Sequence, residues 1–228
     1  MLFLTLLLTT LLFGICHGSP TMKRATLKEV TDSGDNPAAI KMYIYVPYSV
    51  PTSPGIVASL HGASGNTQQH FIAVYPECPQ GAWDATLAES IVHEGGGTSH
   101  HYCMIPVLSN TMAGAYPDVF SGAILYSAGS SKSIRNMYPS YSGSYPKIQL
   151  YLGSKDTIIG SAAFNTTLNT WASVHRYNTS PDELLANTPM PGWTTYALGS
   201  KLEGIWAEGV GHPVPTQGDE DMKWWGFA

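Results

Sequence analysis

Charged side chains are scarce in this sequence, and acidic residues outnumber basic ones. They make up 12% of the 228 residues, with 11 Lys and Arg against 16 Asp and Glu, which gives a net charge of −5. A nucleic-acid-binding face must be basic to meet the phosphates, so this balance argues against such a partner. The chain also has no run of like charges, no low-complexity segment and no internal repeat. Its 43% of hydrophobic residues is enough for one sizeable core, so we expect a single folded domain.

The apolar N-terminal stretch LFLTLLLTTLLFGIC lacks charge but is short. It has fewer than the roughly 20 apolar residues that a membrane span needs. It ends at Cys16-His17-Gly18, which predicts a signal peptide over residues 1–18 with cleavage after Gly18. The pair Lys23-Arg24 predicts either a dibasic processing site, with residues 19–24 as a propeptide and a mature start at Ala25, or two exposed cations in a flexible leader. We therefore expect a secreted, extracellular protein without a membrane anchor.

Secretion gives meaning to the cysteines and to two short asparagine motifs. The chain has three cysteines, and Cys16 leaves with the signal peptide. Cys78 and Cys103 then either form one disulfide or remain free thiols, because the sequence does not give the distance between them. The segments Asn165-Thr166-Thr167 and Asn178-Thr179-Ser180 match the N-glycosylation motif, so we expect glycans at Asn165 and Asn178.

Short apolar runs bounded by Gly and Pro predict the strands of a sheet covered on both faces. Between residues 161 and 177 the hydrophobic period changes to three and four, which predicts an amphipathic helix. The stretch DEDMKWWGF at 219–227 predicts a short terminal helix with acids in its first turn, and the Pro- and Asn-rich residues 178–192 are predicted to be a loop. Strands that alternate with helices indicate an open α/β sheet. The predicted strands are 41–48, 55–62, 71–78, 120–129, 147–154, 193–199 and 202–209.

Two side chains with acid–base chemistry follow predicted strands. Asp156 comes directly after the strand at 147–154, and His212 lies in a Gly- and Pro-bounded loop after the last strand. In open α/β sheets, reactive groups lie on loops at the carboxyl ends of the strands. A histidine that acts as general base needs a carboxylate to fix its tautomer, and an acid before the histidine matches the order in α/β-hydrolases. Taken singly, each residue is also compatible with a plain turn aspartate and a solvated loop histidine.

Four segments of the chain resemble the fungal acetylxylan esterases. These are secreted serine esterases of carbohydrate esterase family 1, related to the feruloyl esterases. The segments are ATLKEVTDSGDNPAAIKMYIYVP (25–47), GSKD (153–156), GVGHPVP (209–215) and GDEDMKWWGF (218–227). The resemblance implies an α/β-hydrolase fold over residues 25–228.

The resemblance also implies roles for particular residues. Asp156 would be the acid and His212 the base of a Ser-His-Asp triad. The family's oxyanion loop would follow His61, with the backbone N–H groups of Gly62 and Ala63 facing the oxyanion. The implied partner is acetylated xylan in plant cell-wall polysaccharide, with feruloyl ester cleavage as the alternative activity. We expect a monomer that needs no cofactor and no metal.

The nucleophile of such a triad is missing from the sequence. Esterases carry it in a G-x-S-x-G turn, and this pattern occurs nowhere in the chain. The resemblance places it between the glycines 95–97 and the segment 115–129, where only the 18 residues from Thr98 to Ala115 are available. A crossover, a strand of roughly 5 residues and a helix of about 10 would all have to fit there. Further shortfalls lie at 61–70 and near 127–143, so we predict an internally truncated α/β-hydrolase.

Three serines are alternatives to the missing nucleophile. Ser64, in HGASGN, falls one residue short of the elbow pattern and has no helical pattern after it. Ser109 lies in a segment that resembles the family's sequence just past the elbow, and Ser130, in AGSSKS, is a loop serine after a strand. We therefore predict a xylan-deacetylating esterase that is inactive or badly impaired, or alternatively a catalytically inactive polysaccharide-binding relative. A wrong gene model, alternative splicing or gene decay would each explain the deletions.

Overall fold

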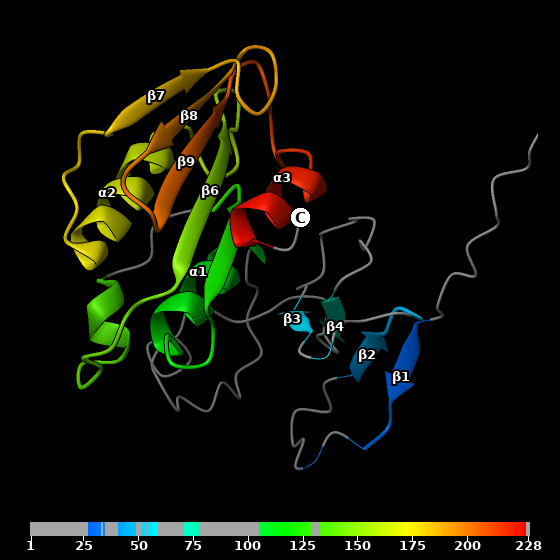
Figure 1. Cartoon of the computed structure of the whole chain (residues 1–228). Coiled ribbons are helices and arrows are strands. Elements are labelled where there is room, and N and C mark those ends of the chain that lie inside the picture. The colour runs from blue at the N-terminus through cyan, green and yellow to red at the C-terminus, as the bar shows by residue number, and fades with distance from the viewer. Residues whose placement is uncertain are drawn as a thin grey trace, which may run out of the picture.

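The computed structural model describes residues 27–32, 34, 41–48, 52, 54–58, 71–77, 105–128 and 133–226 (Figure 1). Strands and helices alternate along the second half of these ranges, which confirms the predicted α/β class. The strands are β1 (Lys28–Val30), β2 (Lys41–Tyr45), β3 (Gly55–Ala58), β4 (Phe71–Glu77), β5 (Gly122–Tyr126), β6 (Lys147–Gly153), β7 (Glu183–Ala186), β8 (Trp193–Ala197) and β9 (Leu202–Ala207). The helices are α1 (Ile105–Ala115), the 3-10 helix η1 (Ile134–Met137), α2 (Ala163–His175) and α3 (Gly218–Trp225).

The described strands form two sheets. In the first, of order β1-β2-β4-β3, only β3 and β4 run parallel to each other. In the second, of order β5-β6-β9-β8-β7, the neighbours β5, β6 and β9 are parallel, and β8 and β7 continue the sheet antiparallel. Three carboxyl ends therefore meet at one edge of the second sheet, where ligands and reactive groups gather in α/β folds.

Helix α2 covers one face of the five-stranded sheet. Alternate residues of β6, among them Leu150 and Leu152, are buried there in one cluster with Trp171 of α2. Gly204 in β9 permits the close approach of the helix, because a Cβ at this position would lie 2.9 Å from Cζ of Phe164. Burying a large apolar side chain contributes about 1.5–3 kcal/mol, so this face holds the main core.

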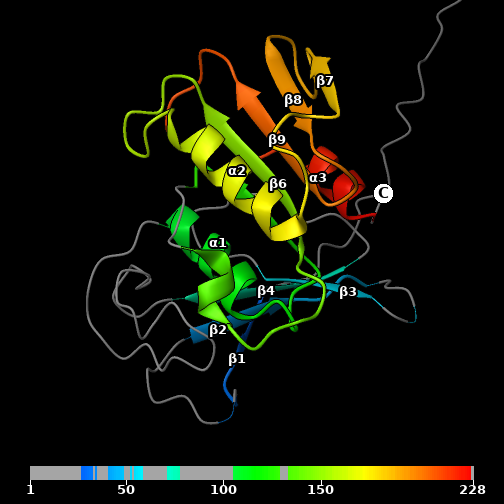
Figure 2. The same ribbon diagram turned by 90° about the vertical axis from the view of Figure 1, so that its left-hand side faces the viewer.

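Helix α3 lies on the opposite face of the same sheet (Figure 1, Figure 2). Tyr151 of β6 and Ile205 of β9 point to this side and form a smaller buried cluster with Val214. Gly122 of β5 allows Trp225 to approach, since a Cβ there would come within 2.8 Å of the indole Nε1. The parallel strands are thus enclosed between α2 and α3, as expected for strands with apolar residues on both faces.

Most of the predicted elements are confirmed, one is wrong in part, and some observed elements, among them β1 and α1, were not predicted. The helix predicted at 161–177 is α2, the terminal helix is α3, and each predicted strand contains one of the observed strands. The prediction of a loop over 178–192 is wrong in part, because β7 lies within it and pairs with β8. Helix α1 was not predicted, since its sequence IPVLSNTMAGA is rich in residues of low helix propensity. No helix within the described ranges is both long and apolar enough to cross a membrane.

Candidate active site

Asp156 lies three residues beyond β6, and its carboxylate is completely buried. Its Oδ1 accepts two backbone hydrogen bonds, from the N–H of Ile158 at 3.0 Å and from the N–H of Ile159 at 2.9 Å. Burial alone would raise the pKa of this carboxyl, but the bonds from Ile159, His212 and Ile158 outweigh it, and the pKa lies below its usual value. Asp156 is therefore ionised at neutral pH and held in one orientation.

His212 lies five residues beyond β9, and its ring meets the carboxylate of Asp156. Nδ1 of the ring is 2.9 Å from Oδ2 of Asp156. The imidazole side chain is 24% exposed, whereas the carboxylate is 0% exposed. Because an ionised carboxylate can only accept hydrogen bonds, Nδ1 carries the proton and Nε2 keeps its lone pair. This is the tautomer that a general base requires.

The loops that carry the acid and the base are joined backbone to backbone. The N–H of Ser154 donates to the carbonyl of Ala207 at 3.0 Å, and the N–H of Lys155 donates to the carbonyl of Val210 at 2.9 Å. Strands β6 and β9 are parallel neighbours, so their carboxyl ends bring both loops to the same edge of the sheet. The separation of acid and base is therefore set by the sheet and the loop backbones as well as by the side chains.

The Asp156–His212 pair can take up a proton at Nε2 and hold it. The imidazolium that results is positively charged, and the buried carboxylate of Asp156 stabilises it. Within the described residues, no serine or threonine hydroxyl makes a hydrogen bond to His212. No group of three or more metal-ligating side chains forms within those ranges. The geometry supports proton transfer with a group that approaches the exposed edge of the imidazole.

Comparisons with known proteins find relatives that match the whole chain. No family model matches the sequence. The chain is 33% identical to the probable acetylxylan esterase A of Aspergillus niger, over 100% of this chain and 98% of that protein. It is 32% identical to acetylxylan esterase A of Aspergillus oryzae, over 100% of both. The solved acetyl xylan esterase from Aspergillus awamori aligns with a TM-score of 0.79 and 32% identity, over 89% of this chain and 100% of that one. The chain belongs to the acetylxylan esterase family.

Acetylxylan esterases contain internal segments that this chain lacks. The alignment with the Aspergillus niger protein spans 298 positions, whereas the chain has 228 residues, so about 70 positions (298 − 228) have no counterpart here. Because the alignment covers the whole chain and 98% of the relative, the missing positions are internal. The predicted internal truncation is thereby confirmed. Helix α1 begins at Ile105, which leaves only residues 98–104 for the elbow strand that the resemblance places before it.

The residues predicted from the sequence and from the family resemblance are only partly covered by the structure. Asp156 and His212 are in contact, as described above. Asn165 is exposed on α2, Asn178 is exposed shortly after it, and Ser109 is half-buried on α1. The predicted signal peptide and propeptide (1–24) lie outside the described residues, as do Gly62, Ala63, Ser64, Cys78, Cys103 and Ser130.

Ser127 is a residue near the site that the sequence analysis missed. It follows β5 directly, has a φ of +51° and is 0% exposed. A non-glycine residue in this left-handed region is uncommon. The sequence LYSAG at 125–129 carries the second half, S-x-G, of the elbow pattern, which is the signal that could have drawn attention to it. Its Oγ accepts the N–H of Val214 at 3.1 Å. A buried hydroxyl cannot reach an ester on a polysaccharide, so Ser127 is not the nucleophile.

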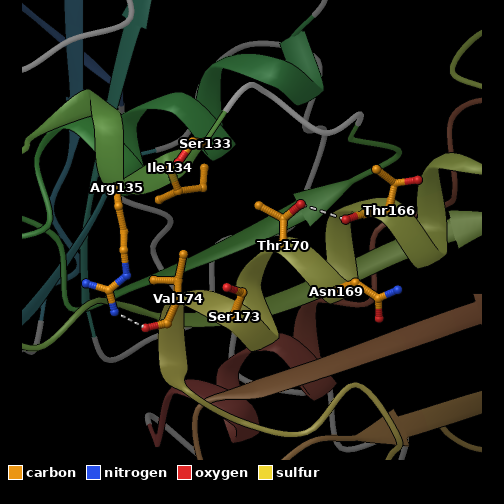
Figure 3. Close-up of a pocket in the computed structure, with 8 residues that line it drawn as sticks. All are labelled: Ser133, Ile134, Arg135, Thr166, Asn169, Thr170, Ser173 and Val174. Atoms are coloured by element: carbon orange, nitrogen blue, oxygen red, sulfur yellow. Dashed lines mark hydrogen bonds between the residues drawn. The ribbon is translucent and has the colours of Figure 1, made fainter.

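A groove of about 500 Å³ lies between η1 and α2 (Figure 3). Neither Asp156 nor His212 lines it. Its one charged side chain, Arg135, donates to the carbonyl of Val174 and lies over the ring of Tyr145, with 5.2 Å between Cζ and the ring centre. Arg135 therefore joins η1 to the end of α2, and the groove offers no group suited to ester chemistry. Its other lining residues are Ser133, Ile134, Thr166, Asn169, Thr170 and Ser173.

Proposed function

We propose that this protein is a secreted carboxylic ester hydrolase that removes acetyl groups from xylan. The observation that carries the proposal is the 2.9 Å contact between Oδ2 of Asp156 and Nδ1 of His212. Such a pair serves ester hydrolysis by moving a proton during the attack on the carbonyl. The substrate follows from the relatives, since the proteins of Aspergillus niger and Aspergillus awamori that match this chain are named acetylxylan esterases.

In the reaction of a complete triad, a serine hydroxyl attacks the acetyl carbonyl and His212 accepts the proton of that hydroxyl through Nε2. Asp156 stabilises the imidazolium, which then gives the proton to the departing sugar oxygen. The backbone N–H groups of Gly62 and Ala63 hold the negative charge of the tetrahedral intermediate. In a serine esterase, water then releases acetate from the acyl-enzyme, with the same histidine as base.

The missing elbow lowers the rate that we expect from this chain. No G-x-S-x-G occurs in the sequence, so the Asp156–His212 pair lacks the hydroxyl that it would activate. Losing the nucleophile of a triad costs about 10⁶ in kcat, while roughly 10³–10⁴-fold catalysis over water remains from the oxyanion hole and substrate binding. We propose slow deacetylation in this residual range. The absence of the elbow also favours a second candidate, an inactive relative that binds xylan without releasing acetate.

The test is acetate release from acetylated xylan by the purified mature chain. The Aspergillus awamori esterase is the reference, and methyl ferulate is the competing substrate. We expect acetate release above the protein-free rate and far below the reference, with no ferulate released. Release of ferulate alone would instead identify a feruloyl esterase. Binding to insoluble xylan without acetate release would overturn the esterase proposal in favour of the second candidate.

We further propose how the chain is processed and assembled. Residues 1–18 are removed as a signal peptide, residues 19–24 as a propeptide, and residues 25–228 remain as a monomeric domain in which Cys78 and Cys103 form a disulfide. The apolar N-terminal stretch and the Lys23-Arg24 pair support this order of cleavage. N-terminal sequencing of the secreted protein should find Ala25 first. A start at Ser19 would show that no propeptide is removed, and a mass equal to that of the fully reduced chain would exclude the disulfide.

A further inference from the structure

The segment that follows His212 donates two backbone N–H groups to side-chain hydroxyls at the carboxyl end of β5. The N–H of Val214 donates to Oγ of Ser127 at 3.1 Å. The N–H of Gln217 donates to the hydroxyl oxygen of Tyr126 at 2.6 Å. Ser127 and Tyr126 thus hold the chain at Val214 and Gln217, which are two and five residues after the histidine.

The hydroxyl of Tyr126 is itself fixed by a buried carboxylate. It donates to Oδ2 of Asp221 at 2.6 Å, and the hydroxyl of Tyr151 donates to Oδ1 of the same carboxylate at 3.0 Å. The two tyrosine rings are stacked, with centroids 4.5 Å apart and 5° between their planes. Because the single proton of the Tyr126 hydroxyl goes to Asp221, the oxygen presents its lone pairs to the N–H of Gln217. Helix α3, β5 and β6 therefore act together on this oxygen.

The backbone of Ser127 has an unusual conformation at this place. Its φ of +51° lies in the left-handed region, which a non-glycine residue adopts only where surrounding contacts require it. Two contacts do so here, because its N–H donates to the carbonyl of Tyr151 at 2.7 Å and its Oγ accepts from Val214. The positive φ of Ser127 is therefore maintained by its hydrogen bonds to β6 and to the segment after His212.

These contacts follow His212 in the chain, whereas the backbone hydrogen bonds to the Asp156 loop precede it. Before the histidine, Val210 accepts the N–H of Lys155; after it, Val214 donates to Ser127. His212 therefore lies between one anchor on the Asp156 loop and one on Ser127, directly after β5. We propose that Ser127 and Tyr126 are positioning residues, which hold the imidazole of His212 in hydrogen-bonding register with Asp156.

This inference rests on the proposed role of His212 as general base, but its geometric content can be measured without any catalysis. Nitrogen NMR of the labelled protein in mildly alkaline buffer reports which nitrogen of each histidine ring carries the proton. The His212→Asn variant identifies the signals of His212, and the Asp156→Asn variant gives the spectrum of a His212 ring without its carboxylate. The wild-type chain is expected to show the proton on Nδ1, because Oδ2 of Asp156 accepts it.

The test variants are Ser127→Ala and Tyr126→Phe, each of which deletes one hydroxyl. We expect the His212 signals of both to move from the wild-type positions toward those of Asp156→Asn. Tyr145→Phe is the matched control, since Tyr145 is buried and its hydroxyl has no hydrogen-bond partner among the described residues. It should leave the His212 signals unchanged. If Ser127→Ala does not fold, Ser127→Gly removes the same Oγ and accepts the positive φ without strain.

Wild-type His212 signals in the folded Ser127 and Tyr126 variants would overturn the positioning role. Failure of the proposed function has a different signature. The wild-type chain would then release no acetate, while the NMR comparison would still decide whether Ser127 and Tyr126 hold the ring.

Discussion

The carbonyl oxygen of Val210 lies where a side chain on Gly153 would begin, since a Cβ built on Gly153 would be only 2.2 Å from it. Gly153 is the last residue of β6, and Val210 stands two residues before His212. The closest approach of the two loops thus falls between the acid and the base. Only a residue without a side chain allows the N–H of Lys155 to reach the Val210 carbonyl at 2.9 Å.

Gly153→Ala is therefore expected to destabilise the protein. The added Cβ must push the Val210 backbone away, and overpacking of this kind lowers the free energy of unfolding by about 1–3 kcal/mol. Urea unfolding followed by tryptophan fluorescence measures the change. Gly218→Ala is the control, because nothing lies within 4 Å of a Cβ at that position. Equal stabilities of the Gly153 variant and the wild-type chain would show that the loops are not held as described.

The carboxyl of Asp221 should make stability fall as the pH rises. Burial raises its pKa from 3.8 to about 6, despite the hydrogen bonds from Tyr126 and Tyr151, and the charges of Glu220 and Glu203 act in the same direction as burial. The folded chain therefore binds this proton more tightly than the unfolded chain. The resulting stabilisation is fully present below about pH 4 and is lost as the pH rises through about 6.

The measurement compares the free energy of unfolding of the wild-type chain with that of Asp221→Asn between acid and neutral pH. Other carboxyls titrate in both proteins, so the difference isolates Asp221. A shift of about 2 pKa units corresponds to about 3 kcal/mol, so the wild-type advantage should decline by up to that amount across the interval. A difference that stays flat or grows with pH would contradict the raised pKa.

The parts of the fold that could be predicted are those in which burial imposes a periodic pattern. Phe164, Leu168 and Trp171 recur at helical spacing in α2 because all three face the sheet. Strand β7 has no such pattern, since all four of its residues are exposed and only pairing with β8 makes it a strand. The local sequence of β7 therefore does not predict a strand, because the strand forms only through pairing with β8.

The same distinction divides the candidate site. Asp156 and His212 could be found because each follows a recognisable strand at the carboxyl edge of the sheet. The roles of Ser127 and Asp221 depend on contacts with residues 87 and 95 positions away in the chain. No local pattern encodes such distances. The S-x-G at 127–129 and the acids of the terminal helix can be recognised in the sequence. Their hydrogen bonds to distant residues form only when α3 packs on β5 and β6.

The contact between α1 and α2 should be sensitive to a single polar substitution. The indole N–H of Trp171 donates to Oδ1 of Asn110 at 2.7 Å, and both side chains are buried. Asn110→Ala leaves this N–H without that partner, which should lower the free energy of unfolding by about 1–3 kcal/mol. Trp171→Phe and the double variant complete a cycle in which the hydrogen bond appears as a coupling energy. Strict additivity would show that the bond contributes nothing.

Glycosylation should occur at both asparagine motifs when the chain passes through a secretory pathway. Asn165 and Asn178 are exposed, but Thr167 of the first motif is buried. The first glycan must therefore be added before α2 packs on the sheet. Intact mass before and after endoglycosidase treatment should show two glycans, with Asn165→Gln and Asn178→Gln losing one each. A mass that does not change on treatment would contradict both sites.

His212→Asn decides whether an unrecognised serine completes the triad. Triad members act as a unit, so once the nucleophile is absent, removing the histidine costs little more. We therefore expect the variant to hydrolyse an aryl acetate within a few-fold of the wild-type rate. A fluorophosphonate, which reacts with activated serines, should label the Aspergillus awamori esterase and leave this chain unlabelled at equal concentration. A loss on the order of 10³-fold or more in the variant would contradict the loss of the nucleophile. A phosphonate found on Ser64, Ser109 or Ser130 by peptide mass spectrometry would also contradict it and would identify the serine that replaces the nucleophile.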